Sequence, residues 1–325
     1  MLVTTIPTAL NNNAKLLTNV YVQRLLIKGD KVEGVEALTI DEHFQRRNSI
    51  KVILKAKHYI LAAGAIGSPS ILLRSDAPNP SGRLGKHTYL HPVVVSGAIM
   101  PDKVAGHSGA PQSIYSDEFL FKDGVDGRAG FKLEVPPIHP ILIGSKLIGY
   151  GEQHRKYMEQ FNYMQVHIAL IRDGFHPQSQ GGTVELSDYG DPVLDYPITD
   201  YLWDGFRRAF LVMAQLQFEV GAKEVFPIHK KGVAYKTMAE AKAGINELNM
   251  ENYWTSVVSA HVMGGCNMGE DPKKSVINSY GSHHQLENLS VFDGSMFPTS
   301  LGANPQLSIY GLIYRNVERL LSRLS

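Results

Sequence analysis

A long apolar run that ends in small residues restricts the fold more than any other stretch of this sequence. Residues 58–75 read "HYILAAGAIGSPSILLRS", and the part before Gly64 is apolar almost throughout. Such a strand is typical of a parallel sheet whose two faces are covered by helices. We expect the strand to stop at Gly64, with Ser68 as the N-cap of a following helix and Pro69 in its first position.

The turn after this strand has two possible uses. A strand, a small-residue turn and a helix start bring backbone N–H groups to one place, where an anionic cofactor can bind. Small residues there also suit a tight connection in which strand and helix pack closely. Taken alone, the pattern at Ala63, Gly64 and Ser68 favours the packing interpretation.

The rest of the chain divides into segments with different patterns of apolar residues. Residues 16–27 and 32–38 are alternating segments around "KGDK", which predicts a hairpin. From about 92 to 255, short strand patterns and a helical stretch at 202–220 indicate an antiparallel sheet with helices packed on it. Residues 305–324 predict a terminal helix that begins near Pro305. The fold class is therefore mixed α/β (α+β), with the boundaries of its parts near residues 92 and 255.

Composition excludes several classes of protein. The 32 basic and 31 acidic residues give a net charge of +1 without a basic stripe, so we expect no nucleic-acid partner. No run of 18 apolar residues is present, so we expect no membrane span. The first residues lack the pattern of a signal peptide. The compartment stays unknown, with the cytoplasm as the default.

The motif "SAHVMGGC", residues 259–266, places a histidine five positions before the only cysteine. A zinc site needs three or four ligands, and the next histidines, His283 and His284, lie in what reads as an exposed turn. We therefore expect no metal. Cys266 follows two glycines among apolar neighbours and reads as a small buried side chain rather than a nucleophile. A G-x-S-x-G serine nucleophile motif is missing from the sequence.

A second group of candidates follows near the end of the chain. Asp293 and Gly294 end a short strand, and Asn304 and Pro305 introduce the terminal helix. A carboxylate at a strand end, close to a helix N-terminus, is a combination from which open α/β sheets build cofactor sites. Taken singly, Asp293 reads as a turn former and Asn304 as a helix N-cap.

Read together, these segments resemble the glucose-methanol-choline (GMC) oxidoreductases, flavoenzymes that oxidise alcohols with FAD. The resemblance extends over most of the chain and keeps the order of the family. It rests on "HYILAAGAIGSPSILLRS", "GRLGKHTYLHP", "SAHVMGGCNMG" and "NLSVFDGSMFPTSLGANPQLSIYGLIYR".

The resemblance implies roles for individual residues. His261 would be the base that takes the alcohol proton, Asn304 would hold the substrate oxygen, and the hydride would pass to flavin N5. Histidine suits the first role because its ordinary pKa lies close to neutral pH. The residues expected to contact FAD are Val20 or Tyr21 at the adenine end, together with Ala63, Gly64, Ser68, Asp293, Gly294, Asn304, Pro305 and Gln306.

Two departures from the family pattern qualify this interpretation. The family commonly has a hydroxyl-bearing residue where this chain has Gly265, and no G-x-G-x-x-G turn for the pyrophosphate occurs in these residues. We therefore expect the C-terminal portion of a GMC enzyme, either a fragment or a split subunit, which binds FAD weakly by itself. It would comprise an incomplete FAD/NAD(P)-binding Rossmann-like domain (1–92 and 256–325) and a substrate-binding domain (93–255). The missing partner would be an N-terminal flavin-binding segment or subunit.

The substrate class is open on sequence alone. Apolar segments such as "MQVHIALI", residues 164–171, slightly favour an apolar alcohol over a sugar, although the same residues suit a sheet core. The alternative to an enzyme is a non-catalytic substrate-binding module or a remnant that lacks flavin. Retention of His261, Asp293 and Asn304 together argues against the remnant.

Overall fold

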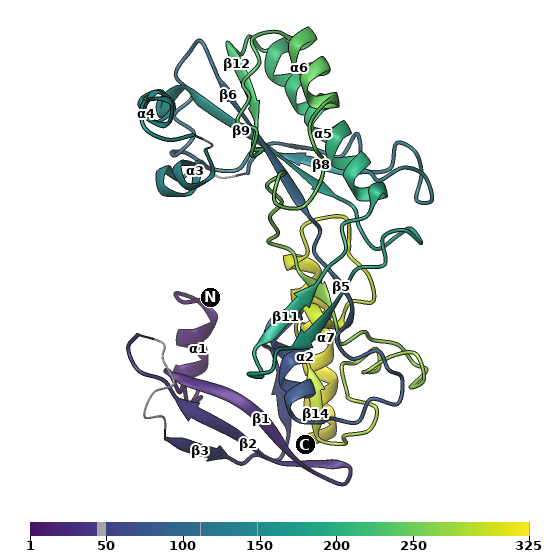
Figure 1. Cartoon of the computed structure of the whole chain (residues 1–325). Coiled ribbons are helices and arrows are strands. Elements are labelled where there is room, and N and C mark those ends of the chain that lie inside the picture. Colours follow the sequence, from purple (N-terminus) through teal and green to yellow (C-terminus); the bar gives the residue numbers. More distant parts are fainter. Residues whose placement is uncertain (44–49, 111, 148, 325) are drawn as a thin grey trace.

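The computed structural model describes residues 1–43, 50–110, 112–147 and 149–324, which form two lobes (Figure 1). The strands are β1 Val20–Lys28, β2 Lys31–Thr39, β3 Lys51–Leu54, β4 Tyr59–Leu61, β5 Lys86–Tyr89, β6 Val93–Ile99, β7 Tyr115–Ser116, β8 Phe131–Glu134, β9 Met164–Ile171, β10 Gly182–Leu186, β11 Pro192–Asp195, β12 Glu224–Pro227, β13 Met263–Gly264 and β14 Leu289–Val291. The helices are α1 Thr5–Asn11, α2 Gly64–Arg74, α3 Pro140–Lys146, α4 Glu152–Glu159, α5 Asp200–Glu219, α6 Met238–Asn246 and α7 Gln306–Leu324, with short 3₁₀ helices η1 Phe161–Tyr163 and η2 Gly294–Met296.

One lobe combines the two ends of the chain. Strands β1, β2 and β3 form an antiparallel sheet, which confirms the predicted hairpin, and Gly29 supplies the positive φ of its turn. Strands β4 and β14 pair in parallel, as the apolar run predicted. Tyr59 and Leu61 of β4 are buried, whereas the side chain between them, Ile60, is 47% exposed. The parallel sheet is therefore covered on only one face within the described residues.

Helix α2 begins earlier than the sequence predicted. Its N-cap is Ala63 and its first residue is Gly64, so the prediction that Ser68 caps the helix and Pro69 opens it is wrong. Pro69 is the sixth residue of the helix, beyond the first turn, so its missing N–H removes one i→i−4 hydrogen bond. The Ser68 hydroxyl instead accepts from Ala63 N and donates to Asp293. A contact with a residue 225 positions away cannot be inferred from local capping rules.

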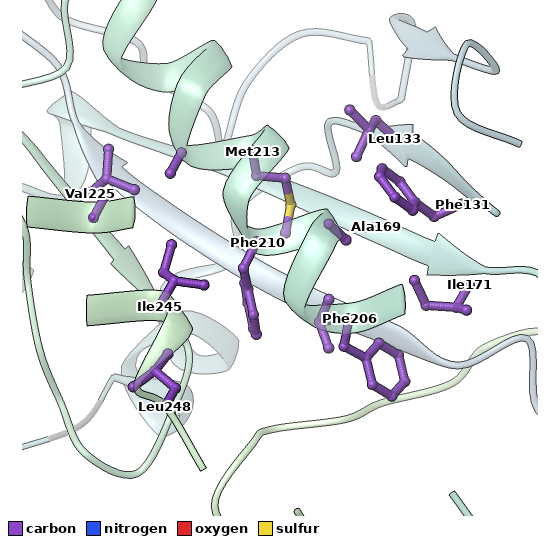
Figure 2. Packing of buried hydrophobic residues seen from close by; sticks show 14 of the residues in the cluster. Phe131, Leu133, Ala169, Ile171, Phe206, Phe210, Met213, Val225, Ile245 and Leu248 are labelled. Atoms are coloured by element: carbon purple, nitrogen blue, oxygen red, sulfur yellow. The ribbon is translucent and has the colours of Figure 1, made fainter. Parts of the chain in front are cut away.

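The other lobe is the predicted antiparallel sheet with helices. Its strands run in the order β12-β6-β9-β8-β7, all antiparallel. Helices α5 and α6 cover one face, and α3 and α4 lie on the other (Figure 1). Helix α5 has apolar residues at helical spacing, and Phe206, Phe210 and Met213 are fully buried against Ala169 and Ile171 of β9 (Figure 2). This packing holds β6 and β9 in place, so that their opposite face is a rigid surface.

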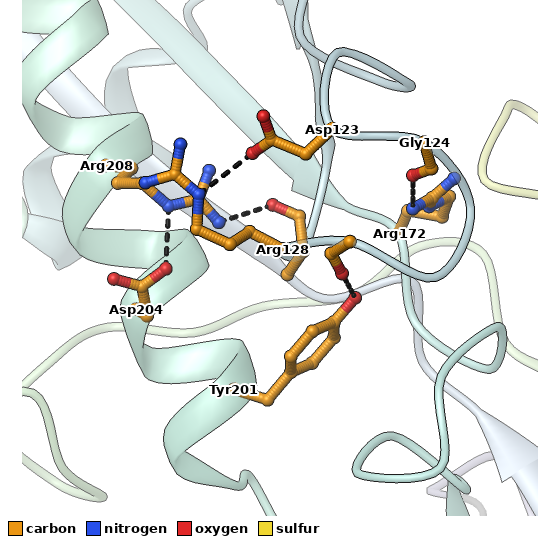
Figure 3. A network of polar contacts seen from close by, with 9 residues as sticks. Asp123, Gly124, Arg128, Arg172, Tyr201, Asp204 and Arg208 are labelled. Carbon is orange, nitrogen blue, oxygen red and sulfur yellow. Dashed lines mark hydrogen bonds and ion pairs between the residues drawn. The ribbon is translucent and has the colours of Figure 1, made fainter.

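A polar network holds the loop before β8 on helix α5 (Figure 3). Arg208 donates to Asp204 at 2.7 Å and to the Ala129 carbonyl at 2.7 Å, while Tyr201 donates to the Gly127 carbonyl at 3.0 Å. The loop is thereby held against the same helix that packs on the sheet.

No helix in the described ranges combines the length and the apolar character that crossing a membrane requires.

Candidate active site

The central histidine of "SAHVMGGC" lies where the two lobes meet. A small sheet, β11-β10-β5-β13, pairs Tyr89 of β5 with Met263 of β13. Val93 and Val258 also bridge the same two segments. These pairings bring His91 to His261, with 3.0 Å between their Nδ1 atoms and 5.1 Å between the stacked rings.

Burial keeps this histidine pair neutral. Burial, followed by the nearby His261, lowers the pKa of His91 to about 3. Burial also lowers the pKa of His261, and Lys132 lowers it further while Glu134 opposes the change. A proton between the two Nδ1 atoms can belong to either ring. When His261 carries it, His261 Nε2 has a free lone pair and can accept a proton from a ligand.

Asp173 organises the loop that carries His91. Its buried carboxylate accepts from the backbone N–H groups of Leu90 at 2.9 Å and His91 at 3.2 Å, and from the Tyr196 hydroxyl at 2.8 Å. Ser300, in the segment before α7, also donates to it. Burial raises the pKa of Asp173, and these hydrogen bonds counteract that rise. His91 has a φ of 49°, a backbone conformation that side chains rarely adopt, and the Asp173 contacts offset its cost.

A cavity of about 230 Å³ ends at His261. One wall is the face of β6 and β9 opposite α5, and the other is formed by residues 136–139 and helix α3. Polar groups lie at its margin, where Gln112 donates to Glu134 at 3.2 Å. The side chains that face the cavity from the sheet are aliphatic: Val93, Val95, Val166, Ile168 and Leu170. The site can therefore hold an apolar group next to a neutral imidazole.

Five of the predicted cofactor residues meet at the end of the parallel strands. Asp293 Oδ2 accepts from Gly64 N at 3.0 Å and from the Ser68 hydroxyl at 2.5 Å, and its Oδ1 accepts from Ser295 N at 2.7 Å. Ala63 is exposed beside them, and Gly294 is buried. Asp293 thus joins the end of β14 to the start of α2. The roles of these residues toward FAD remain predictions.

The remaining candidates lie at other places in the same lobe. Asn304 and Gln306 are exposed at the start of α7, with Pro305 buried between them, and Gln306 donates to Tyr310 at 2.8 Å. Asn304 is not among the residues that line the cavity at His261. Val20 is half-buried at the first position of β1. Their roles likewise remain predictions.

The surroundings of Gly64 fit a nucleotide cofactor. Its φ is +77° and no atom lies within 4 Å of the position that a Cβ would occupy, so a ligand can approach the backbone closely there. The N-termini of α2, with 11 residues, and α7, with 19 residues, are both partly exposed and can face negative charge. The residues present are therefore compatible with FAD.

Several features of this site were not identified from the sequence. His91 stood in a quoted motif but was not singled out, because its meaning depends on pairing with a segment 170 residues away. Asp173 carried no local signal. His283 is buried, so the prediction that it lies in an exposed turn is wrong, while Cys266 is fully buried as predicted.

Gly265 has a structural reason to lack a side chain. Its φ is +95°, and a Cβ there would lie 3.0 Å from the Thr88 hydroxyl and 3.1 Å from Pro69. A hydroxyl therefore does lie beside this position, supplied by Thr88 of β5.

Comparisons with known proteins agree with this geometry. Two models of the GMC oxidoreductase family match the chain, one over residues 1–93 and the other over residues 177–312. An uncharacterised GMC-type oxidoreductase of Sinorhizobium fredii is 25% identical over 100% of this chain and 61% of its own length. A long-chain-alcohol oxidase of Arabidopsis thaliana is 25% identical over 81% of this chain and 36% of its own length. A 2-methyl-1,2-propanediol dehydrogenase of Mycolicibacterium austroafricanum is 26% identical over 98% of this chain and 56% of its own length. The chain thus spans between 36% and 61% of the length of these relatives.

Solved structures share the fold. Pyridoxine 4-oxidase from Mesorbium loti has a TM-score of 0.67 at 17% identity and covers 97% of this chain and 60% of its own. A formate oxidase has a TM-score of 0.66 at 13% identity, and the match covers 94% of this chain and 60% of the oxidase chain. The predicted mixed α/β class and the assignment of FAD as the cofactor of the family are thereby confirmed. With two family models matched at its two ends, the chain belongs to the GMC oxidoreductase family.

Proposed function

We propose that this chain carries the alcohol-binding cavity and the catalytic base of an FAD-dependent oxidoreductase that acts on CH–OH groups. One observation carries the proposal: His261, kept neutral by burial, lies at the end of an otherwise largely aliphatic cavity. A neutral imidazole is the form that can accept the proton of an alcohol.

In the proposed mechanism, an alcohol enters the cavity with its hydroxyl at His261 Nε2. His91 holds the opposite ring nitrogen and orients the imidazole, and when the shared proton is on His261 Nδ1 the Nε2 lone pair is free for the alcohol. His261 takes the hydroxyl proton, and Asn304, if it turns toward the same oxygen, donates an N–H to it. Bound FAD would supply the hydride acceptor for the substrate carbon, at flavin N5. The buried cavity walls exclude water from the reacting carbon.

We further propose which residues hold the FAD. The turn of Ala63 and Gly64 and the α2 N-terminus would face the pyrophosphate, with Ser68, Asp293 and Gly294 fixing that turn. Asn304, Pro305 and Gln306 would lie beside the isoalloxazine, and Val20 would lie toward the adenine. The half-exposed Ile60 of β4 supports a further proposal, that a strand–turn–helix unit outside these 325 residues completes the sheet and the pyrophosphate site.

Steady-state assays test the activity. The protein is supplied with excess FAD, which compensates for weak binding, and aliphatic alcohols and sugars are offered with oxygen and with a dye as acceptors. We expect aldehyde formation from aliphatic alcohols. His261→Gln should lower kcat by about 10²- to 10⁴-fold, the usual contribution of a general base. Binding of alcohols and FAD without turnover under either acceptor would instead support the non-catalytic module.

A further inference from the structure

One buried carboxylate lies between the segments that carry His261 and Asn304. Asp173 follows β9 and is fully buried. It accepts hydrogen bonds from four groups: Leu90 N, His91 N, the Tyr196 hydroxyl and the Ser300 hydroxyl. Because none of these four groups is an imidazole or an amide side chain, Asp173 acts through the backbone of the segments around it.

On one side, hydrogen bonds lead from Asp173 to the backbone of His261. Leu90 N donates to Asp173 at 2.9 Å, and the Leu90 carbonyl accepts from the Ser259 hydroxyl. The same hydroxyl accepts from His261 N at 3.4 Å. His91 N also donates to Asp173, at 3.2 Å. The carboxylate therefore supports the backbone of both stacked histidines.

On the other side, the contacts lead toward Asn304. The Ser300 hydroxyl donates to Asp173 and accepts from Gly302 N at 3.2 Å. One residue earlier, the Thr299 hydroxyl donates to the Gly174 carbonyl at 2.9 Å. Residues 299–302 are thereby bonded along the segment that follows β9.

Gly302 and Pro305 fix the chain on either side of Asn304. Gly302 has a φ of +65°, and a Cβ there would lie 3.0 Å from Cγ of the buried Arg172, so only glycine fits this close contact. Pro305 is buried, and its carbonyl accepts from Ile309 N at 2.9 Å in the first turn of α7. The backbone of Asn304 is therefore held between the Asp173 contacts and the terminal helix.

A carboxylate is the side chain that suits four donors. It has acceptor sites only, whereas an amide would turn an N–H2 group toward one of the donors. Burial of a charge costs free energy, and burial raises the pKa of Asp173 while its hydrogen bonds oppose the rise. Donors from three segments that are far apart in the sequence thus meet on one side chain that only they satisfy.

We propose that Asp173 is a positioning residue, which sets the distance between His261 and Asn304 by holding the backbone of both segments. A base and a hydrogen-bond donor must meet at one substrate oxygen, and a misplacement of about 1 Å costs up to ~10²-fold in rate. The inference rests on the proposed function for the roles of these two residues. The shared support by Asp173 does not depend on turnover.

Asp173→Asn tests the role with a side chain of the same shape. The asparagine oxygen can replace Oδ2 and accept from Leu90 N and the Tyr196 hydroxyl, but its N–H2 group then faces His91 N. With excess FAD, we expect kcat to fall between about tenfold and 10²-fold, with a smaller change in KM.

The pH profile separates positioning from general loosening of the fold. In Asp173→Asn the low-pH limb of kcat should move, because the His91 ring shifts against His261. The other ionisable side chains that act on this pair, Lys132 and Glu134 of β8, are the same in both proteins.

Ser300→Ala releases only the side that leads to Asn304. We expect kcat to fall about tenfold, with the low-pH limb in place, because the contacts of His91 remain. The double variant with Asp173→Asn should lose less than the product of the two single losses, since both act through the same contact. Ser96→Ala is the matched control: Ser96 is also fully buried and donates to Gln217 at 3.1 Å, and kcat should stay the same.

Hydrogen–deuterium exchange reads the two supports without turnover. In Asp173→Asn we expect exchange about fivefold faster in both segments, 86–93 and 299–305, a factor that corresponds to the loss of a hydrogen bond of ~1 kcal/mol. In Ser300→Ala only 299–305 should exchange faster, and in Ser96→Ala neither should.

The outcomes separate this inference from the proposed function. If thermal unfolding shows that Asp173→Asn does not fold, Ser300→Ala against Ser96→Ala decides between support and no support. Unchanged exchange in both segments, or unchanged kcat and pH profile in the folded variants, contradicts the role of Asp173. Faster exchange in both segments in a protein that oxidises no alcohol contradicts the proposed function and leaves the shared support standing, whereas equal turnover in all variants does the reverse.

Discussion

Nδ1 of His261 lies 3.0 Å from Nδ1 of His91, so the two imidazoles are hydrogen-bonded to each other. Replacing His91 with Phe keeps a flat ring but removes the Nδ1 atom that shares a proton with His261, so His261 loses its orientation and its hydrogen-bond partner. We expect kcat to fall about tenfold, or ~1.4 kcal/mol of transition-state stabilisation, with a smaller change in KM. The low-pH limb of the kcat profile should also move, which a purely structural role of His91 would not cause.

The control for this prediction is His91→Asn, whose side-chain oxygen can take the place of Nδ1 as an acceptor. It should recover part of the lost kcat and the position of the pH limb. A Phe variant with the kcat and pH profile of the parent protein would remove His91 from the mechanism.

Two buried histidines make the fold sensitive to acid. Burial lowers the pKa of His91 to about 3 and that of His283 to about 4, against an ordinary value of 6.5. Below pH 6.5 these two histidines bind protons in the unfolded chain but not in the folded chain. Their contribution to the free energy of unfolding is therefore fully present above pH 6.5 and is lost as the pH drops toward 4. At pH 5 each histidine should lower the free energy of unfolding by ~2 kcal/mol relative to neutral pH. Urea unfolding at pH 7.5 and pH 5 measures the loss.

His283→Asn isolates one of these contributions. An asparagine oxygen can still accept from Gln285 N, as His283 Nδ1 does at 3.1 Å, but it does not titrate. The variant should lose about 2 kcal/mol less than the parent protein between the two pH values. An identical loss in both proteins would show that His283 is accessible to protons in the folded state.

At the scale of elements, Asp293 joins β14 to α2. Asp293→Ala would leave Gly64 N, Ser295 N and the Ser68 hydroxyl without their acceptor, so we expect the free energy of unfolding to fall by about 3 kcal/mol. The affinity for FAD should fall as well, because the turn at Gly64 loses its support. Chemical unfolding and FAD titration measure the two effects.

Asp271→Ala is the matched control. Its carboxylate also accepts a backbone N–H, that of Lys273 at 2.9 Å, but it lies in an exposed turn. We expect a change within about 0.5 kcal/mol. Equal effects of the two variants would mean that the Asp293 contacts do not hold the two elements together.

Elements defined by local pattern could be predicted from the sequence, whereas elements defined by distant partners could not. The hairpin of β1 and β2, helix α5 and the start of α7 followed from alternation, helical spacing and Pro305. The start of α2 did not, because the Ser68 hydroxyl is used by Asp293 rather than by its own helix. His91 and Asp173 were missed for the same reason, since β5, β13 and the segment after β9 meet only in the folded chain.

At the scale of the whole molecule, the two lobes have separate cores. The clusters around Phe210 and Phe226 draw their buried residues from Val94 to Leu248, and the cluster around Leu289 draws them from Leu25 to Leu84 and from Cys266 to Leu320. We propose that they correspond to domains divided near residues 92 and 255, and we expect two transitions in calorimetry. Phe210→Leu should lower the melting temperature of one transition only. A single transition that shifts as a unit would contradict two domains.

Anaerobic reduction of the flavin tests the role of His261 most directly. The FAD-loaded protein and its His261→Gln variant are each mixed with octanol, and the absorbance of oxidised flavin is followed in a single turnover. We predict rapid bleaching in the parent protein and a rate lower by about 10²-fold or more in the variant, with the same amount of flavin bound in both. Equal bleaching rates would show that His261 is not the base, and the absence of bleaching in the FAD-loaded parent protein with every aliphatic alcohol would contradict alcohol oxidation at this site.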